Sequence, residues 1–84
     1  MRAAMRLVLD QAFRPEGEGG YGLGRVSLDA GDGNLGSQAV ARSSGFTETG
    51  RDRQVYLLPD GSLRDLVRFD LLADEWRNRQ AARA

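Results

Sequence analysis

A turn between two apolar stretches is the feature that most constrains how this chain can fold. In "RQVYLLPDGSLRDLVRFDLL", Pro59–Gly61 separates two segments rich in aliphatic and aromatic residues. Pro-Asp-Gly favours a turn because proline presets φ and glycine tolerates positive φ. The predicted core side of the second strand carries Leu63, Val67, Phe69 and Leu71. Arg64 and Arg68 lie on the opposite side and are expected in solvent, so the segment is predicted to be a hairpin with one buried face.

The first segment, "MRAAMRLVLDQAFR", has the periodicity of an amphipathic helix. Asp10 is spaced to pair with Arg6 or Arg14, four residues away in either direction. Pro15 is expected to end the helix, because the residue before a proline is disfavoured in the helical region. The apolar stripe predicted to face the core consists of Met1, Ala4, Met5, Val8, Ala12 and Phe13.

A short strand and a short helix are predicted next. In "LGRVSLDA", Val26 and Leu28 share one side, as in a half-buried strand. "GDGN" then turns the chain, and Asn34 is the predicted N-cap of the helix "LGSQAVARSS". Gly45 is expected to take the left-handed conformation after this helix, with Phe46 folding back onto it.

The C-terminal segment "ADEWRNRQAARA" is polar, with helical tendency, and Trp76 is its only large anchor. We therefore divide the chain into a folded region, residues 1–76, and a polar tail, residues 77–84. The predicted order is helix, strand, helix, strand, strand. This order indicates an α/β layer with a terminal β-hairpin.

The glycine-rich stretch "RPEGEGGYGLGRV" matches two phosphate-binding patterns, G-x-G-x-x-G and R-x-x-G-x-G. Both patterns work only where a strand enters the loop and a helix leaves it, because the helix N-terminus points free N–H groups at the anion. Here a predicted helix enters and a strand leaves, and Glu16 and Glu18 add negative charge. The stretch is therefore interpreted as a flexible helix-to-strand connection rather than a nucleotide site.

Composition excludes several classes of chemistry. The 84 residues include 12 basic and 12 acidic side chains but no histidine and no cysteine. Disulfides, thiolate nucleophiles, zinc sites and imidazole bases are thereby excluded, and we predict no metal. A chain with no net charge and no long apolar run favours neither nucleic acid nor membrane as a partner, so one small cytoplasmic domain is expected.

Several short motifs occur in an order that resembles the second half of the GNAT acetyltransferase fold. A strand opening "GL-x-RV", then "N-x-x-S", then a helix ending "GF" is similar to the branch that acetylates the N-termini of ribosomal proteins (RimJ/RimL-like). "MRAAMRLVLDQAF" resembles the helix after the pyrophosphate loop, and the closing "LL-x-x-EW" also resembles the family. The resemblance implies an α/β, partial GNAT fold that lacks the N-terminal half, including the R-x-x-G-x-G loop and the fourth strand.

The resemblance also implies candidate site residues. Asn34 matches the asparagine whose amide contacts the pantetheine arm of acetyl-CoA in the family. Ser37 matches a serine that hydrogen-bonds the cofactor sulfur, so it is the candidate catalytic and cofactor-binding residue. Without the resemblance, Asn34 is explained as an N-cap and Ser37 as an ordinary residue of the first helical turn. Tyr21 and Tyr56 are possible proton donors, for which packing is the favoured interpretation.

Two classes of function remain open at this point. The first is an N-acetyltransferase that moves acetyl from acetyl-CoA to a primary amine, either a protein N-terminus or a small amine. A complementing polypeptide or a second copy would then supply the missing loop and strands. The second class is a non-catalytic module that self-associates. Under either reading, an open strand edge and uncovered apolar surface predict a homodimer or larger assembly with an extended sheet.

Overall fold

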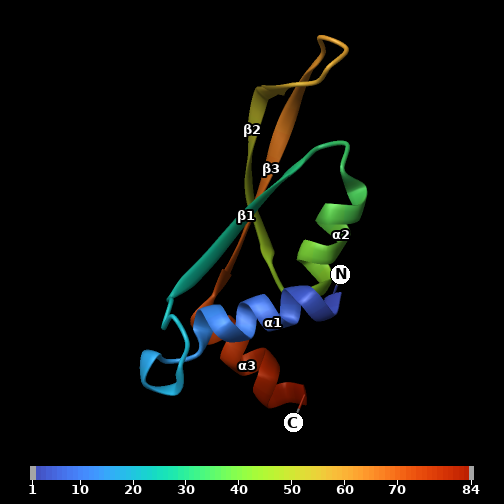
Figure 1. Ribbon diagram of the computed structural model, residues 1–84. Coiled ribbons are helices and arrows are strands. Elements are labelled where there is room, and N and C mark those ends of the chain that lie inside the picture. The colour runs from blue at the N-terminus through green and yellow to red at the C-terminus, as the bar shows by residue number, and fades with distance from the viewer. Residues whose placement is uncertain (1, 84) are drawn as a thin grey trace.

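The computed structural model describes residues 2–83, which form a three-stranded antiparallel sheet with three helices (Figure 1). The spatial order of the strands is β1-β3-β2, so β3 is central and receives hydrogen bonds from both neighbours. The predicted order of elements is confirmed, with a third helix after the hairpin. The elements are α1 (Arg2–Phe13), the 3-10 turn η1 (Glu16–Glu18), β1 (Arg25–Gly31), α2 (Leu35–Ser43), β2 (Thr47–Leu57), β3 (Leu63–Leu72) and α3 (Ala73–Arg83).

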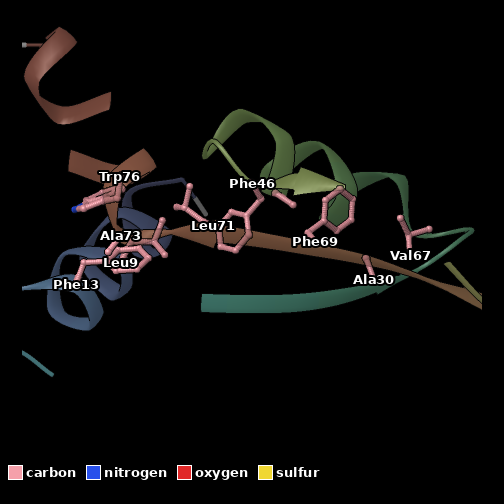
Figure 2. Close-up of a cluster of buried hydrophobic side chains, with 10 residues drawn as sticks. Leu9, Phe13, Ala30, Phe46, Val67, Phe69, Leu71, Ala73 and Trp76 are labelled. Carbon is pink, nitrogen blue, oxygen red and sulfur yellow. The ribbon is translucent and has the colours of Figure 1, made fainter. Parts of the chain in front are cut away.

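One core joins the central strand to all three helices (Figure 2). Val67, Phe69 and Leu71 alternate along β3 and are fully buried, as their period of two predicts. Leu63, assigned to the same side from the sequence, is 51% exposed. It lies beside the hairpin turn, beyond the part of the sheet that the helices reach (Figure 1), so it stays outside the core.

The buried face of α1 differs from the apolar stripe predicted to face the core. Leu9, absent from that stripe, is 1% exposed, whereas Val8 is 59% exposed. Met5, Leu9 and Phe13 follow each other at intervals of four and form the face that packs into the core. This rotation brings the Phe13 ring onto Trp76 of α3, with ring centroids 6.0 Å apart. Trp76 therefore anchors α3, a helix that runs continuously through residue 76.

Both ends of α2 are closed as predicted. The side chain of Asn34 accepts a hydrogen bond from the Ser37 N–H, which is an N-cap. At the other end Gly45 has φ 96°, and the N–H of Phe46 donates to the carbonyl of Ala41. This pair of features is a Schellman cap, and it turns the buried Phe46 back onto the helix.

Arg68 is exposed, as predicted, and it also pairs with acidic side chains of both neighbouring strands. Its guanidinium pairs with the carboxylate of Asp52 on β2 and lies 3.9 Å from that of Asp29 on β1. The hydrogen bond from Arg68 lowers the pKa of Asp52 below its usual value. The three strands are thus joined by charges on the face opposite the core, although exposed pairs of this kind contribute little stability.

The glycine stretch joins a helix to a strand, as predicted, but it is tied down rather than loose. The N–H groups of Tyr21, Gly22 and Leu23 donate to the carbonyls of Gln11, Arg14 and Ala12 at 2.8–3.0 Å. These bonds satisfy the carbonyls that the end of α1 leaves without an intrahelical partner. The stretch is therefore a helix C-terminal cap. Because it faces the negative end of the helix dipole, it is unsuited to phosphate.

Two glycines of this stretch differ in the space around them, so substituting each one alone tests how closely the stretch packs against the end of α1. A Cβ on Gly20 would lie 2.1 Å from the backbone oxygen of Arg14, whereas one on Gly17 meets nothing within 4 Å. We expect Gly20→Ala to lower the free energy of unfolding by about 1–3 kcal/mol, the usual cost of overpacking. Gly17→Ala is the matched control and should change it by less than about 0.5 kcal/mol. Urea unfolding followed by circular dichroism measures both, and equal effects would contradict the capping role.

Candidate functional site

The turn from β1 into α2 brings together the two residues singled out from the sequence. β1 ends at Gly31, and Asn34 caps α2 with its Oδ1 3.1 Å from the backbone nitrogen of Ser37. Asn34 is exposed and Ser37 is half-buried. Within residues 2–83, the Asn34 Nδ2 and the Ser37 Oγ have no hydrogen-bond partner, so both groups are free to bind a ligand.

Gln38 positions this turn, and sequence reasoning missed it. Its side chain is 5% exposed, and Nε2 donates to the carbonyls of Gly31 and Asp32 at 2.9 and 3.1 Å. A single amide therefore links the first turn of α2 to the end of β1. The sequence did contain a signal for this role. Gln38 lies three positions before Ala41, so both residues lie on the same, buried face of the helix.

The electrostatics of the turn favour a neutral ligand over a phosphate. The Asp32 carboxylate lies just before α2, and its Oδ1 is buried with no hydrogen-bond partner in the described part of the chain. Negative charge at this position interacts favourably with the positive end of the helix dipole. That carboxylate would repel an incoming anion but would not repel a neutral amide or thioester group. The Asn34 amide and the Ser37 hydroxyl are therefore hydrogen-bond donors that suit an uncharged ligand.

The two tyrosines are placed differently. Tyr56 crosses the sheet so that its hydroxyl lies 2.0 Å from where a Cβ on Gly31 would be. A side chain at position 31 would therefore displace the Tyr56 ring from the end of β1. Tyr21 lies in the glycine stretch and is exposed.

A separate polar depression lies at an irregularity of β2. Arg53, Gln54 and Asp65 line a shallow hollow of about 500 Å³. Gln54 has φ 51°, and its N–H donates to Oδ1 of Asp65 at 2.8 Å. This backbone bond, together with Arg51, lowers the pKa of the Asp65 carboxyl. Asp65 is therefore ionised at neutral pH and serves as an acceptor that holds the bulge, not as a proton donor.

Comparison with known proteins places this geometry in a known fold. No family model and no curated protein matches the chain. Among solved structures, a probable acetyltransferase superposes with a TM-score of 0.78 and 36% identity, over 89% of this chain and 39% of that one. A GCN5-related N-acetyltransferase from Brucella melitensis gives 0.78 and 26%, over 90% and 32%. The spermidine/spermine N-acetyltransferase SpeG from Vibrio cholerae, solved with manganese ions, gives 0.79 and 22%, over 93% and 42%.

These likenesses show an α/β structure with part of the GNAT fold. The structural neighbours are acetyltransferases, of which the chain spans between 32 and 45% of the length. The expected partial GNAT fold is thereby confirmed. Within the described residues, no helix combines the length and apolarity needed to cross a bilayer.

Proposed function

We propose that this chain is the C-terminal half of a GNAT-type N-acetyltransferase of the cytoplasm, related to the branch that modifies ribosomal protein N-termini. The reaction moves acetyl from acetyl-CoA to a primary amine, on a protein N-terminus or a small molecule. The pyrophosphate loop and the remaining strands of the fold, which these 84 residues do not include, come from a complementing segment. The observation that carries the proposal is the superposition of 89% of this chain on a probable acetyltransferase at 36% identity.

The turn at α2 supports a role at the reacting end of the cofactor. In acetyl transfer the amine nitrogen forms a bond to the thioester carbonyl carbon, the carbon–sulfur bond breaks, and the sulfur leaves as a thiolate, which takes up the proton that the nitrogen gives up. The Ser37 hydroxyl is a free donor that would stabilise the charge developing on that sulfur. The Asn34 amide, held by its capping bond to the Ser37 N–H, would donate to the pantetheine arm. Direct attack needs no covalent enzyme intermediate, so a chain without cysteine is compatible with it.

A specific observation favours a second candidate, a non-catalytic module derived from the same fold. The capping bond from the Ser37 N–H to Asn34 accounts for the asparagine without any cofactor. Leu7, Val8 and Leu35 are also more than half exposed on α1 and α2. Apolar surface of this kind is typical of proteins that bind another chain.

Calorimetric titration of the purified chain with acetyl-CoA tests the proposal. Saturable binding would show that these residues form a cofactor site by themselves, and no detectable binding at millimolar ligand would contradict catalysis by this chain alone and favour the module. Ser37→Ala should lower the rate of acetyl transfer by about ten- to a hundredfold, since one hydrogen bond to the leaving group is lost. Ser43→Ala is the matched control, because this serine bonds the Val40 carbonyl at the opposite end of α2. Equal rates for both variants would contradict a role for Ser37.

A further inference from the structure

The pairing of β2 with β3 contains a bulge close to the end of β1. Residues 53–55 of β2 stand opposite the single residue Asp65 of β3, so β2 carries two extra residues there. We call these three residues the β2 bulge. Bulges change the direction of a strand and re-aim its side chains, and they are common next to active sites. The contacts of this bulge lead to the turn between β1 and α2.

The carboxylate of Asp65 holds the bulge in place. Gln54, the middle residue, has φ 51°, a backbone conformation that is uncommon for residues other than glycine. Its N–H donates to Oδ1 of Asp65 at 2.8 Å, and Nη1 of Arg51 lies 3.4 Å from Oδ2. A residue in such a conformation persists only where its surroundings hold it. Asp65 supplies that hold.

The backbone of Asp65 also reaches the candidate site. Its carbonyl accepts a hydrogen bond from the N–H of Asp32 at 3.0 Å, directly after the end of β1. The carbonyl of Asp32 in turn accepts from the buried amide of Gln38 at 3.1 Å. The N–H of Asn34 donates to Gly31 at 2.9 Å, which closes the turn. One residue of β3 therefore joins the bulge to the turn.

The bulge also determines where Tyr56 lies. If the preceding register continued without extra residues, Tyr56 would face Ser62. The bulge places it opposite Arg64 instead, roughly 7 Å further along β3 toward the centre of the sheet. Gly31 pairs with Leu66, which shares a face of β3 with Arg64. The Tyr56 hydroxyl can therefore approach to 2.0 Å from the position of a Cβ on Gly31.

We infer that Asp65 and Tyr56 position the turn between β1 and α2, which carries both candidate site residues. Asp65 acts through its bonds to the bulge and to Asp32, and Tyr56 acts through its packing on Gly31. Every one of these contacts is made within residues 2–83, so none depends on other segments of the fold. The consequence for acetyl-CoA rests on the proposed function, whereas the coupling of the bulge to the turn does not.

Amide hydrogen exchange followed by NMR tests the coupling. Asp65→Ala removes the acceptor of the Gln54 N–H but keeps the carbonyl that binds Asp32. We expect the N–H groups of Asp32 and Asn34 to exchange at least about fivefold faster, roughly the effect of one lost hydrogen bond. The Phe46 N–H, bonded to Ala41 at the opposite end of α2, is the internal reference and should change by less than about twofold. Unchanged exchange in the turn, or equal acceleration at all three groups, would overturn the positioning role.

Two matched variants separate this bulge from the rest of β2. Asp65→Asn keeps an oxygen that can accept from Gln54, so its turn should exchange at close to the wild-type rate. Thr49→Ala lies at the other irregularity of β2, between Glu48 and Gly50, and should leave the turn unchanged. If Thr49→Ala accelerated exchange in the turn as much as Asp65→Ala, the coupling would not belong to this bulge.

Tyr56 variants provide a test that does not require Asp65→Ala to fold. Tyr56→Ala removes the ring from Gly31, whose carbonyl accepts from the Asn34 N–H. We expect this N–H to exchange at least about threefold faster in Tyr56→Ala, while Tyr56→Phe, which keeps the ring, stays near the wild type. Equal rates in these two variants would overturn the role of the ring.

Calorimetric titration with acetyl-CoA connects the coupling to the proposed function. Asp65→Ala should bind acetyl-CoA at least about threefold more weakly than the wild type, and Thr49→Ala should bind it equally well. Unchanged affinity in an Asp65 variant whose turn exchanges faster would overturn a role for the bulge in the cofactor site. If the wild-type chain binds no acetyl-CoA, catalysis by this chain alone fails, while the exchange rates still decide whether the bulge holds the turn.

Discussion

Phe69→Ala is expected to unfold much of the population of this protein. Phe69 is fully buried in the C-terminal half of β3, and the guanidinium of Arg42 lies 5.3 Å from its ring centroid. Removing a buried phenylalanine side chain costs about 3–5 kcal/mol, through lost burial and the cavity left behind. A domain of this size has a total stability of roughly 4–13 kcal/mol at about 0.05–0.15 kcal/mol per residue. The loss is therefore a large share of the total stability and equals all of it at the lower end of that range.

Urea unfolding monitored by circular dichroism measures this loss as a lower midpoint. Leu63→Ala is the matched control, because it also removes an apolar side chain from β3, but one that is 51% exposed. The control should cost less than about 1 kcal/mol. A Phe69 variant as stable as the Leu63 variant would show that the two ends of β3 contribute alike and that the core is not centred where the structure places it.

Gln38→Leu is expected to lower the free energy of unfolding by about 1–3 kcal/mol. Leucine is close to glutamine in size but donates no hydrogen bond, so the carbonyl of Asp32 loses its donor, while that of Gly31 keeps the N–H of Asn34. Each buried acceptor left unpaired costs about 1–3 kcal/mol. Chemical denaturation gives the change in stability. Amide hydrogen exchange at the start of α2 should rise at the same time, because the turn carrying Asn34 loses its anchor.

The matched control for Gln38 lies on α1. Gln11 makes the same type of bond, from Nε2 to the carbonyl of Gly19 at 2.7 Å, but it is exposed. Water replaces the lost donor at an exposed site, so Gln11→Leu should cost less than about 1 kcal/mol. If both substitutions cost the same, burial of the Gln38 amide would not be the cause of its effect.

Acetyl-CoA binding by the Gln38 and Gln11 variants tests whether Gln38 also has a role in function. In the proposed acetyltransferase, Gln38 is a positioning residue that acts through Asn34 and Ser37. Its loss should therefore weaken acetyl-CoA binding by more than the loss of Gln11 does. A Gln38 variant with unchanged binding but lower stability would confine the residue to folding.

The sequence by itself determined those elements whose signals lie within a few residues of one another. The hairpin follows from Pro59–Gly61, and the boundaries of α2 follow from Asn34 and Gly45, because caps and turns depend on local φ/ψ preferences and local hydrogen bonds. The pairing of Asn34 with Ser37 belongs to the same group, since one helical turn brings the two residues together. The placement of the candidate site was accordingly predictable.

Only the tertiary structure decided which side of α1 is buried and what holds the site in place. Val8 and Leu9 are equally apolar, and Leu9 is buried because it shares a helix face with Phe13, whose ring packs on Trp76 more than sixty residues away in the sequence. In the same way, Gln38 becomes an anchor only because β1 ends beside it, and Arg68 is paired only because β1 and β2 bring carboxylates to either side of it. Contacts between distant segments follow from packing the whole chain, so local patterns do not encode them.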